Sequence, residues 1–195
     1  MNEPSYPIEG GCTCRRVRYA MRTPPLVVHC CHCRWCQRET GTAFALNAMI
    51  EADRVSVLGE APELVATPSQ SGAGQQIARC RHCRVAVWSH YAGAGPLLDF
   101  IRVGTLDQPD LLPPDVHIFT ESKQPWVVLD ARVPVFAQYY EREAVWSGAS
   151  LARRQVLLPA DRGLSDEPQG RGALSSDDGA SEIESCQKLL RSTQA

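Results

Sequence analysis

The feature that most constrains this chain is a dense run of cysteines at residues 30–36, which reads Cys-Cys-His-Cys-Arg-Trp-Cys. It holds four of the nine cysteines of the 195-residue chain. Two outlying pairs, Cys12/Cys14 and Cys80/Cys83, lie on either side of it. Four thiolates complete a tetrahedral zinc ion, whereas three leave one position open. The grouping therefore predicts one four-cysteine site and one three-cysteine site, and a fold that brings distant segments together.

Composition and charge favour metal binding over disulfides and exclude several classes of partner. Nine is an odd number of cysteines, and residues 1–7 lack the basic start and apolar core of a signal peptide. We therefore expect a cytoplasmic protein, in which thiols stay reduced and can bind metal. The net charge of -2 and the lack of a basic run argue against a nucleic-acid partner. No apolar run approaches the roughly 20 residues of a membrane-spanning helix.

Short apolar and alternating segments predict a mainly β fold. Strands are expected at Arg16–Met21, Leu26–His29, Phe44–Ile50, Val55–Leu58, Glu63–Ala66, Gln75–Arg79, Val85–Tyr91, Leu97–Val103 and Val116–Phe119, with Pro125–Leu129 as a last strand or an extended arm. A helical turn that follows Cys33 is expected to end near Gly41.

The chain divides into four expected parts. Residues 1–9 read as a lead-in, 10–134 as the zinc-binding domain, and 135–159 as a helical extension that Gly148 interrupts. Residues 160–195 are rich in Gly, Ser, Asp and Glu and poor in apolar side chains. Such a composition cannot repay the entropy of ordering, so we expect a disordered tail.

Backbone geometry sorts the thiols into two sets. In an extended segment, residues two apart point to the same face. Cys31 and Cys33 can therefore chelate together with Cys36, whereas Cys30 points to the opposite face, beside His32. A second structural site, completed by Cys30, His29 or His32, is the alternative for this group. We expect Cys30 to be a small buried hydrophobe, and Cys186 in the tail to be an exposed free thiol.

The chain resembles the family of glutathione-dependent formaldehyde-activating enzymes from Gly11 to about Asp130. The motifs that carry the resemblance are Gly11-Cys12-Thr13-Cys14 before an Arg-Val-Arg-Tyr strand, Cys31-His32-Cys33-Arg34-Trp35-Cys36-Gln37-Arg38 with Thr40-Gly41, Cys80-Arg81-His82-Cys83, Gly104-Thr105-Leu106-Asp107, and His117-Ile118-Phe119 with Lys123 and Pro125-Trp126.

The resemblance implies an antiparallel β-tent that is stapled by zinc, and two zinc ions per chain. The short C-terminal helices that the residue pattern predicts lie outside the part that the resemblance covers. The structural zinc would be bound by Cys12, Cys14, Cys80 and Cys83, and the catalytic zinc by Cys31, Cys33 and Cys36. The implied activity is that of a carbon–sulfur lyase, which joins glutathione and formaldehyde into S-hydroxymethylglutathione.

Two departures from the family pattern bear on the substrate. Arg84 follows Cys83, where many members have glycine, and Cys30 is an additional thiol. A centromere-associated relative, centromere protein V, shares the cysteine pattern, but its chromatin role should bring basic segments, which this chain lacks.

The three-cysteine site predicts a chemistry for the lyase. Three thiolates give a zinc site a net charge of about -1, which favours a further soft ligand over activation of water. A thiol at the open position would lose its proton and could attack the aldehyde carbon. Arg34 and Arg38 are the first candidates to bind the carboxylates of glutathione, and Arg81, Arg84 and Lys123 are further ones. The alternative for each is a solvated surface charge.

The other polar and aromatic side chains near the cysteines each have two interpretations. His32 and His117 could relay a proton, or could be buried structural histidines. Trp35 could form a wall of the substrate pocket or simply pack. The competing function is a non-catalytic zinc module that binds a protein partner or glutathione. A redox switch between Cys30 and Cys31 ranks last, because adjacent cysteines form a disulfide only with strain.

Overall fold

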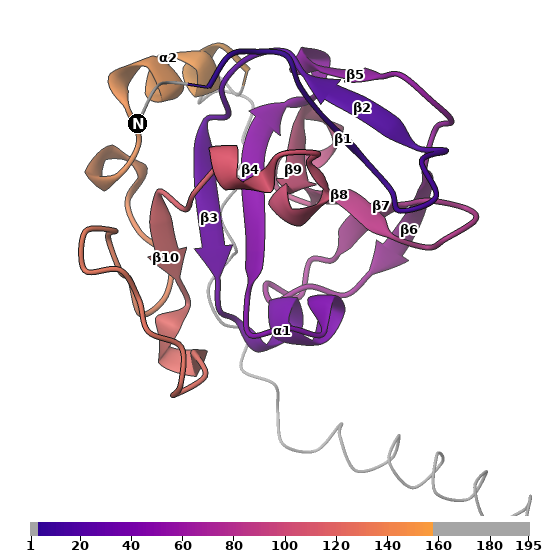
Figure 1. The fold of residues 1–195 in the computed structure, drawn as a ribbon. Coiled ribbons are helices and arrows are strands. Elements are labelled where there is room, and N and C mark those ends of the chain that lie inside the picture. The colour runs from indigo at the N-terminus through magenta and orange to yellow at the C-terminus, as the bar shows by residue number, and fades with distance from the viewer. Residues whose placement is uncertain (1–3, 158–195) are drawn as a thin grey trace, which may run out of the picture.

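The structure is a computed structural model that describes residues 4–157 (Figure 1). It is mainly β, with two α-helices, α1 (Arg34–Thr40) and α2 (Gly148–Leu157). The strands are β1 (Ile8–Gly11), β2 (Arg18–Met21), β3 (Val27–Cys31), β4 (Ala45–Glu51), β5 (Val55–Val57), β6 (Glu63–Thr67), β7 (Gln75–Arg79), β8 (Ala86–Tyr91), β9 (Leu98–Arg102) and β10 (Val116–Ile118). Neither α-helix has the length and hydropathy of a membrane-spanning segment. The tail expected at 160–195, with Cys186, lies outside the described residues.

The strands form two sheets. One has three strands in the order β1-β2-β5, and the other has seven in the order β10-β3-β4-β9-β8-β7-β6. Every pair is antiparallel except β10 with β3, which is parallel. The predicted mainly β, antiparallel-rich fold is confirmed.

The large sheet carries an apolar core on each face. Along β4, Ala48 and Ile50 belong to one buried cluster, which includes Tyr19 of the small sheet. Met49 belongs to a second cluster, which includes Trp146 near the C-terminal end of the described chain. This assignment follows the two-residue period of a strand, so both faces of β4 are buried. The same alternation sends neighbouring cysteines of β3 to opposite faces.

The N-terminal segment is ordered into a strand earlier than the sequence indicates. Strand β1 begins at Ile8, inside the expected lead-in, and Ile8 is opposite Met21 in β2. Gly10 makes this close pairing possible, because a Cβ there would lie 2.6 Å from the Tyr19 hydroxyl oxygen. Long-range pairing of this kind leaves little local signal in the sequence.

Two C-terminal expectations differ from the structure. Residues 125–129 do not form the strand that was one of the two alternatives for them: residues 125 and 126 lie in a turn, in which the amide of Val127 donates to the carbonyl of Gln124 over 3.1 Å, and residues 127–129 have no regular secondary structure. Residues 135–141 are not helical, although their aromatic spacing is helix-like, because Phe136 donates its amide to the carbonyl of His117 at the edge of the sheet. The helix starts at Gly148, where an interruption was expected.

An ion pair attaches α2 to the large sheet. The guanidinium of Arg153 donates to both carboxylate oxygens of buried Glu51, over 2.8 and 2.5 Å, and to the carbonyl of Pro24 over 2.9 Å. Burial alone would raise the pKa of Glu51, but the hydrogen bond and charge of Arg153 outweigh it and hold that pKa below the ordinary 4.5. The lowered pKa means that the pair stabilises the fold above pH 4.5.

We expect Arg153→Ala to reduce the free energy of unfolding by about 3 kcal/mol at pH 7, because it leaves a buried carboxylate without its main partner. The difference from the native chain should shrink as the pH falls below 4.5 and Glu51 is protonated. Urea unfolding at several pH values measures both effects. Arg132→Ala, which breaks an exposed pair with Asp130, is the matched control and should leave the free energy of unfolding nearly unchanged, because water screens an exposed ion pair.

Candidate metal centre and substrate pocket

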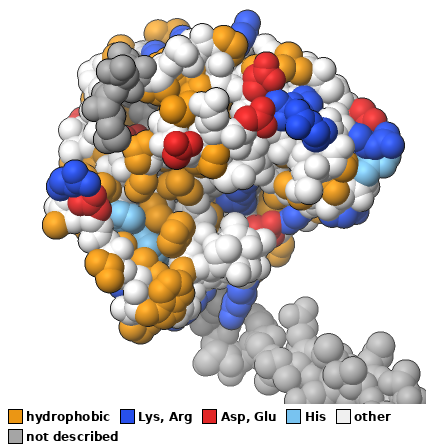
Figure 2. Space-filling model, viewed as in Figure 1, with side chains coloured by type: hydrophobic (Ala, Val, Ile, Leu, Met, Phe, Trp, Pro, Cys, Tyr) orange, Lys and Arg blue, Asp and Glu red, His pale blue; other side chains and the backbone are white. Residues whose placement is uncertain are grey.

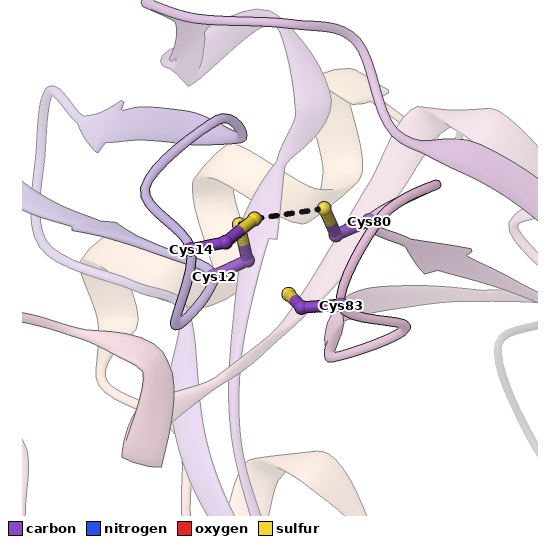
Figure 3. A group of neighbouring side chains, drawn as sticks. All are labelled: Cys12, Cys14, Cys80 and Cys83. Atoms are coloured by element: carbon purple, nitrogen blue, oxygen red, sulfur yellow. Dashed lines mark hydrogen bonds between the residues drawn. The ribbon is translucent and has the colours of Figure 1, made fainter.

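Four cysteines from two distant loops meet in one cluster, which we call the tetrad: Cys12, Cys14, Cys80 and Cys83 (Figure 3). Their sulfur atoms all lie within 4.8 Å of one another. The sulfur of Cys14 is 3.4 Å from that of Cys12 and 3.6 Å from that of Cys80, across 66 residues of sequence. The tetrad therefore joins the start of the chain to the loop between β7 and β8.

The two loops of the tetrad have the same construction. In each, the first cysteine donates its amide to the carbonyl five residues later: Cys12 to Val17 over 3.1 Å and Cys80 to Val85 over 3.0 Å. The residue after the second cysteine is left-handed, with φ of 64° at Arg15 and 62° at Arg84. Glycine adopts this conformation without strain. Arg84 thus adopts the left-handed backbone conformation that favours glycine, the residue expected at this position from the resemblance.

The second cluster, which we call the triad, consists of Cys31, Cys33 and Cys36, all buried, with sulfur atoms within 4.8 Å of one another. Cys31 ends β3, and Cys33 is the N-cap residue of α1. The sulfur of Cys33 accepts the amide of Cys36 over 3.4 Å, and Gly41 ends the helix with φ of 67°. The strand end and the helix cap together aim three thiols at one point.

Without a cation, ionisation of one thiol of the triad opposes ionisation of the other two. Hydrogen bonds from Cys31 and Cys36, with the backbone amides of α1, lower the pKa of Cys33 to about 3. Hydrogen bonding to the other two thiols, with burial, raises the pKa of Cys31. The hydrogen bond with Cys31 acts to lower the pKa of Cys36. The hydrogen bond with Cys33, burial and the charge of Cys33 outweigh it and raise that pKa to about 12. A bound divalent cation would allow all three to become thiolates.

Gln37 fixes α1 against the rest of the site. Its buried amide nitrogen donates to the carbonyls of His32, over 2.6 Å, and Ser122, over 2.9 Å. Its oxygen accepts from Arg34 over 2.9 Å and from Gln124 over 2.8 Å. One side chain therefore connects the triad helix to residues 122–124, a loop that is 85 residues away from it in sequence.

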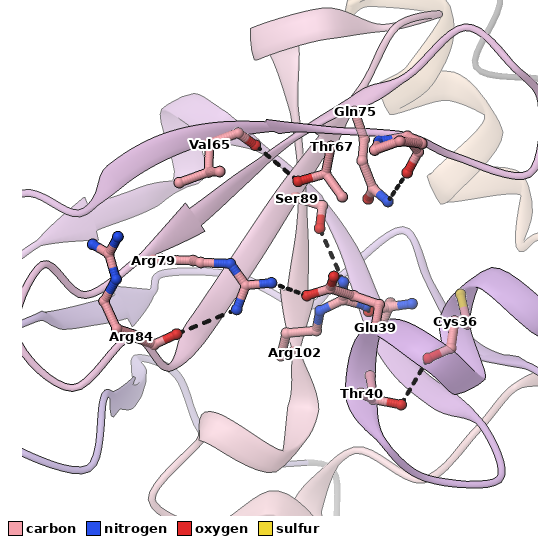
Figure 4. Close-up of polar contacts among 12 residues, drawn as sticks. Cys36, Glu39, Thr40, Val65, Thr67, Gln75, Arg79, Arg84, Ser89 and Arg102 are labelled. Atoms are coloured by element: carbon pink, nitrogen blue, oxygen red, sulfur yellow. Dashed lines mark hydrogen bonds and ion pairs between the residues drawn. The ribbon is translucent and has the colours of Figure 1, made fainter. Parts of the chain in front are cut away.

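A cavity of about 480 Å³ lies at the end of the sheet beside α1. Its polar lining includes Glu39 and Thr40 of α1 together with Arg79, Arg84 and Arg102 (Figure 4). The space-filling view shows a hollow in which basic and acidic side chains gather (Figure 2). Arg79 is ion-paired with Glu39, and Arg84 with Glu63. Arg102 differs from both.

Arg102 is a buried cation without a carboxylate partner among residues 4–157. Only 7% of its surface is exposed, and it donates to the Asn47 side chain over 2.7 Å and to the Ser89 hydroxyl over 3.1 Å. Its Nε has no hydrogen-bond partner in the described part of the chain. Its charge acts to lower the pKa of Cys36, against the rise described above. An anion in the cavity, which Glu39 and Thr40 of α1 also line, would neutralise this charge.

The arginines and the lysine that were predicted to bind the carboxylates of glutathione lie in different parts of the structure. Arg34 and Arg38 are exposed on α1, and neither is ion-paired in the described part of the chain. Arg81 is exposed beside the tetrad. Lys123 donates to the carbonyls of Gln124, over 3.1 Å, and Val127, over 2.7 Å, so its ammonium group serves the local turn.

The two histidines that were predicted near the cysteines are buried, whereas Trp35 is partly exposed. His32 and His117 are buried and contact each other over 3.1 Å. Burial, then the charge of His117, lowers the pKa of His32 to about 4. The triad group contains none of the three alternative fourth ligands, His29, Cys30 and His32. Trp35 remains 36% exposed on α1.

Sequence reasoning missed Gln37 and Arg102. Arg102 ends a strand and looks like an ordinary solvated charge, and its burial depends on β4 and β8 flanking it. The one available signal was its place next to the Gly104-Thr105 motif. Gln37 lay within the quoted cysteine motif, but nothing local indicated that its amide would be buried.

Both cysteine clusters fit a thiophilic ion. All seven residues offer sulfur, the tetrad supplies four ligands and the triad three, and zinc is bound in proteins by such sets. The fold and these clusters together define a mainly β protein that is equipped to bind metal.

Comparison with known proteins gives the family. Residues 7–122 match the family described as "Glutathione-dependent formaldehyde-activating enzyme". The chain belongs to this family. No curated protein matches it. Among solved structures, a Rhodobacter sphaeroides structural-genomics target aligns with a TM-score of 0.41 and 16% identity, covering 66% of this chain and 100% of that one.

Proposed function

We propose that this protein is a zinc-dependent carbon–sulfur lyase that joins or cleaves a glutathione–aldehyde adduct, with S-hydroxymethylglutathione as the prototype. The observation that carries the proposal is a buried group of three thiols that has no fourth side-chain ligand among residues 4–157. The helix that carries two of these thiols also lines a cavity, through Glu39 and Thr40, and the buried Arg102 of that cavity has no carboxylate partner within the same residues. Family membership supports the glutathione chemistry.

The triad would hold the catalytic zinc and the tetrad a structural zinc, two ions in these clusters. A zinc ion on Cys31, Cys33 and Cys36 supplies an open position for a soft ligand and lowers the pKa of a thiol placed there. Hydrogen bonds from Cys31 and Cys36, with the backbone amides of α1, lower the pKa of Cys33, and the bonds of Gln37 keep α1 in place against strand β3. These contacts preserve the three-thiol arrangement when a substrate enters or leaves.

Arg102 would bind one carboxylate of glutathione. It is buried and fixed by Asn47 and Ser89, and its Nε–H has no acceptor among residues 4–157, so little further ordering is needed when an anion arrives. Arg34 and Arg38 on α1 remain candidates for the second carboxylate, because neither is ion-paired within residues 4–157. Both reactants would then be held beside one another, which lowers the entropic part of the barrier.

We expect Arg102→Met to raise the KM for glutathione about 10- to 100-fold, the loss of about 1.5–3 kcal/mol for a hydrogen bond to a charged group. Exchange between formaldehyde and glutathione, followed by NMR, measures the effect. With 2-mercaptoethanol, a thiol without a carboxylate, the variant should match the native enzyme. Equal losses with both thiols would contradict a carboxylate-binding role. Arg38→Gln is the matched exposed control and should change KM less.

We expect the two clusters to lose metal at different rates. The triad ion should exchange with a chelator and respond to added glutathione, whereas the tetrad ion should resist both, because four ligands close its coordination sphere. Native mass spectrometry with added glutathione reports metal count and thiol binding together. Glutathione binding without turnover would instead assign the chain as a non-catalytic module.

A further inference from the structure

A third group of metal-ligand side chains lies outside the tetrad and the triad. It consists of Cys30, His32 and His117, and their sulfur and ring-nitrogen atoms all lie within 4.8 Å of one another. All three residues are buried, with exposures of 2%, 0% and 7%. The proposed lyase chemistry does not use Cys30.

Strand pairing explains how these side chains meet. In the parallel pair of β10 and β3, His117 is opposite Cys30. His32 follows Cys30 by two residues, so both point to the same face of the extended chain. Cys31, between them, points to the other face and belongs to the second apolar core. The third group is therefore separated from the triad by the backbone of β3.

Two contacts converge on one ring nitrogen, which can satisfy only one of them by a hydrogen bond. The Nε2 of His32 is 3.1 Å from the Nδ1 of His117 and 3.5 Å from the sulfur of Cys30. A ring nitrogen carries either one proton or one lone pair, so it can form a good hydrogen bond with only one of these neighbours. A cation among the three atoms would accept a lone pair from each.

The spacing matches a zinc coordination sphere. With Zn–N distances of about 2.0 Å and a Zn–S distance of about 2.3 Å, tetrahedral angles separate two nitrogen ligands by about 3.3 Å and a nitrogen from a sulfur by about 3.5 Å. The observed separations are 3.1 and 3.5 Å.

We propose that Cys30, His32 and His117 form a third metal site, with one thiolate and two imidazole ligands, for Zn²⁺. The site is independent of the lyase proposal, because it shares no ligand with the tetrad or the triad. Imidazole and thiolate are borderline and soft ligands, which suit a late first-row ion better than Mg²⁺ or Ca²⁺. The extra thiol at position 30 is what completes the ligand set.

Metal count and ligand type test this site together. The full chain, loaded with zinc, should bind three ions by native mass spectrometry. Loaded with ¹¹³Cd²⁺, it should give three cadmium NMR signals, the most shielded one from the nitrogen-rich site. Cys30→Ala should reduce the count from three to two and remove only that signal. Cys186→Ala, the matched cysteine control, should keep three ions.

A second variant covers the possibility that Cys30→Ala folds poorly. His117→Gln keeps both thiol clusters and should likewise lose only the shielded signal. A native chain that binds two ions, with Cys30→Ala also binding two, would overturn the proposal. Loss of a thiolate-type cadmium signal in either variant, or uptake of copper without zinc or cadmium at this group, would also overturn it.

Discussion

Replacing Cys80 by serine should unfold the domain. Cys80 is fully buried, and its sulfur contacts that of Cys14 across 66 residues of sequence. Loss of Cys80 therefore removes the cross-link that closes the longest loop among the cysteine clusters. A structural zinc ion contributes about 10 kcal/mol or more to folding, which is comparable with the whole stability of a domain. Circular dichroism and urea unfolding of the purified chain measure the effect.

The control for this variant is a serine at Cys186, outside the described residues. That variant should keep the native unfolding midpoint. If Cys80→Ser instead retained a cooperative transition within about 1 kcal/mol of the native chain, the tetrad could not be a structural metal site.

Cys33→Ser should abolish turnover while the fold persists. We expect the rate of formaldehyde–glutathione exchange to fall by about 100-fold or more, because the triad loses a ligand of its ion. The stability loss should stay below about 2 kcal/mol, because the triad closes only a short loop and serine is a better N-cap residue for α1 than cysteine. NMR exchange spectroscopy and urea unfolding separate the two effects.

Cys33→Ser and Cys80→Ser control for each other. Cys33→Ser should lose activity with little loss of stability, and Cys80→Ser should lose both activity and stability. Full exchange activity in Cys33→Ser would show that the triad is not catalytic.

The cysteine clusters were predictable because spacings of two or three residues decide which thiols within a segment can bind one ion. A C-x-C step in an extended segment places two thiols on one face, and C-x-x-C at the start of α1 completes the triad, so local geometry alone brings Cys31, Cys33 and Cys36 together. The same alternation predicted that Cys30 would point away from the triad. It did not predict that Cys30 would meet His117, because that contact depends on β10 pairing with β3.

The strands were predictable where alternation was strong, and less so where pairing decides the conformation. Ile8 and Glu9 become strand because β2 lies beside them, and Val135 to Glu141 lose helical structure because the backbone of β10 offers them hydrogen bonds. In both cases long-range hydrogen bonds override local propensity.

By itself, the sequence determined which residues can bind metal and how many ligands each cysteine cluster offers, since these depend on residue type and on spacings of two or three residues. The tertiary structure alone decided that Arg102 is buried without a carboxylate partner among residues 4–157, that Gln37 secures α1, and that His117 reaches Cys30. Those properties arise from segments far apart in the chain, because burial and electrostatic environment are set by neighbours that folding supplies.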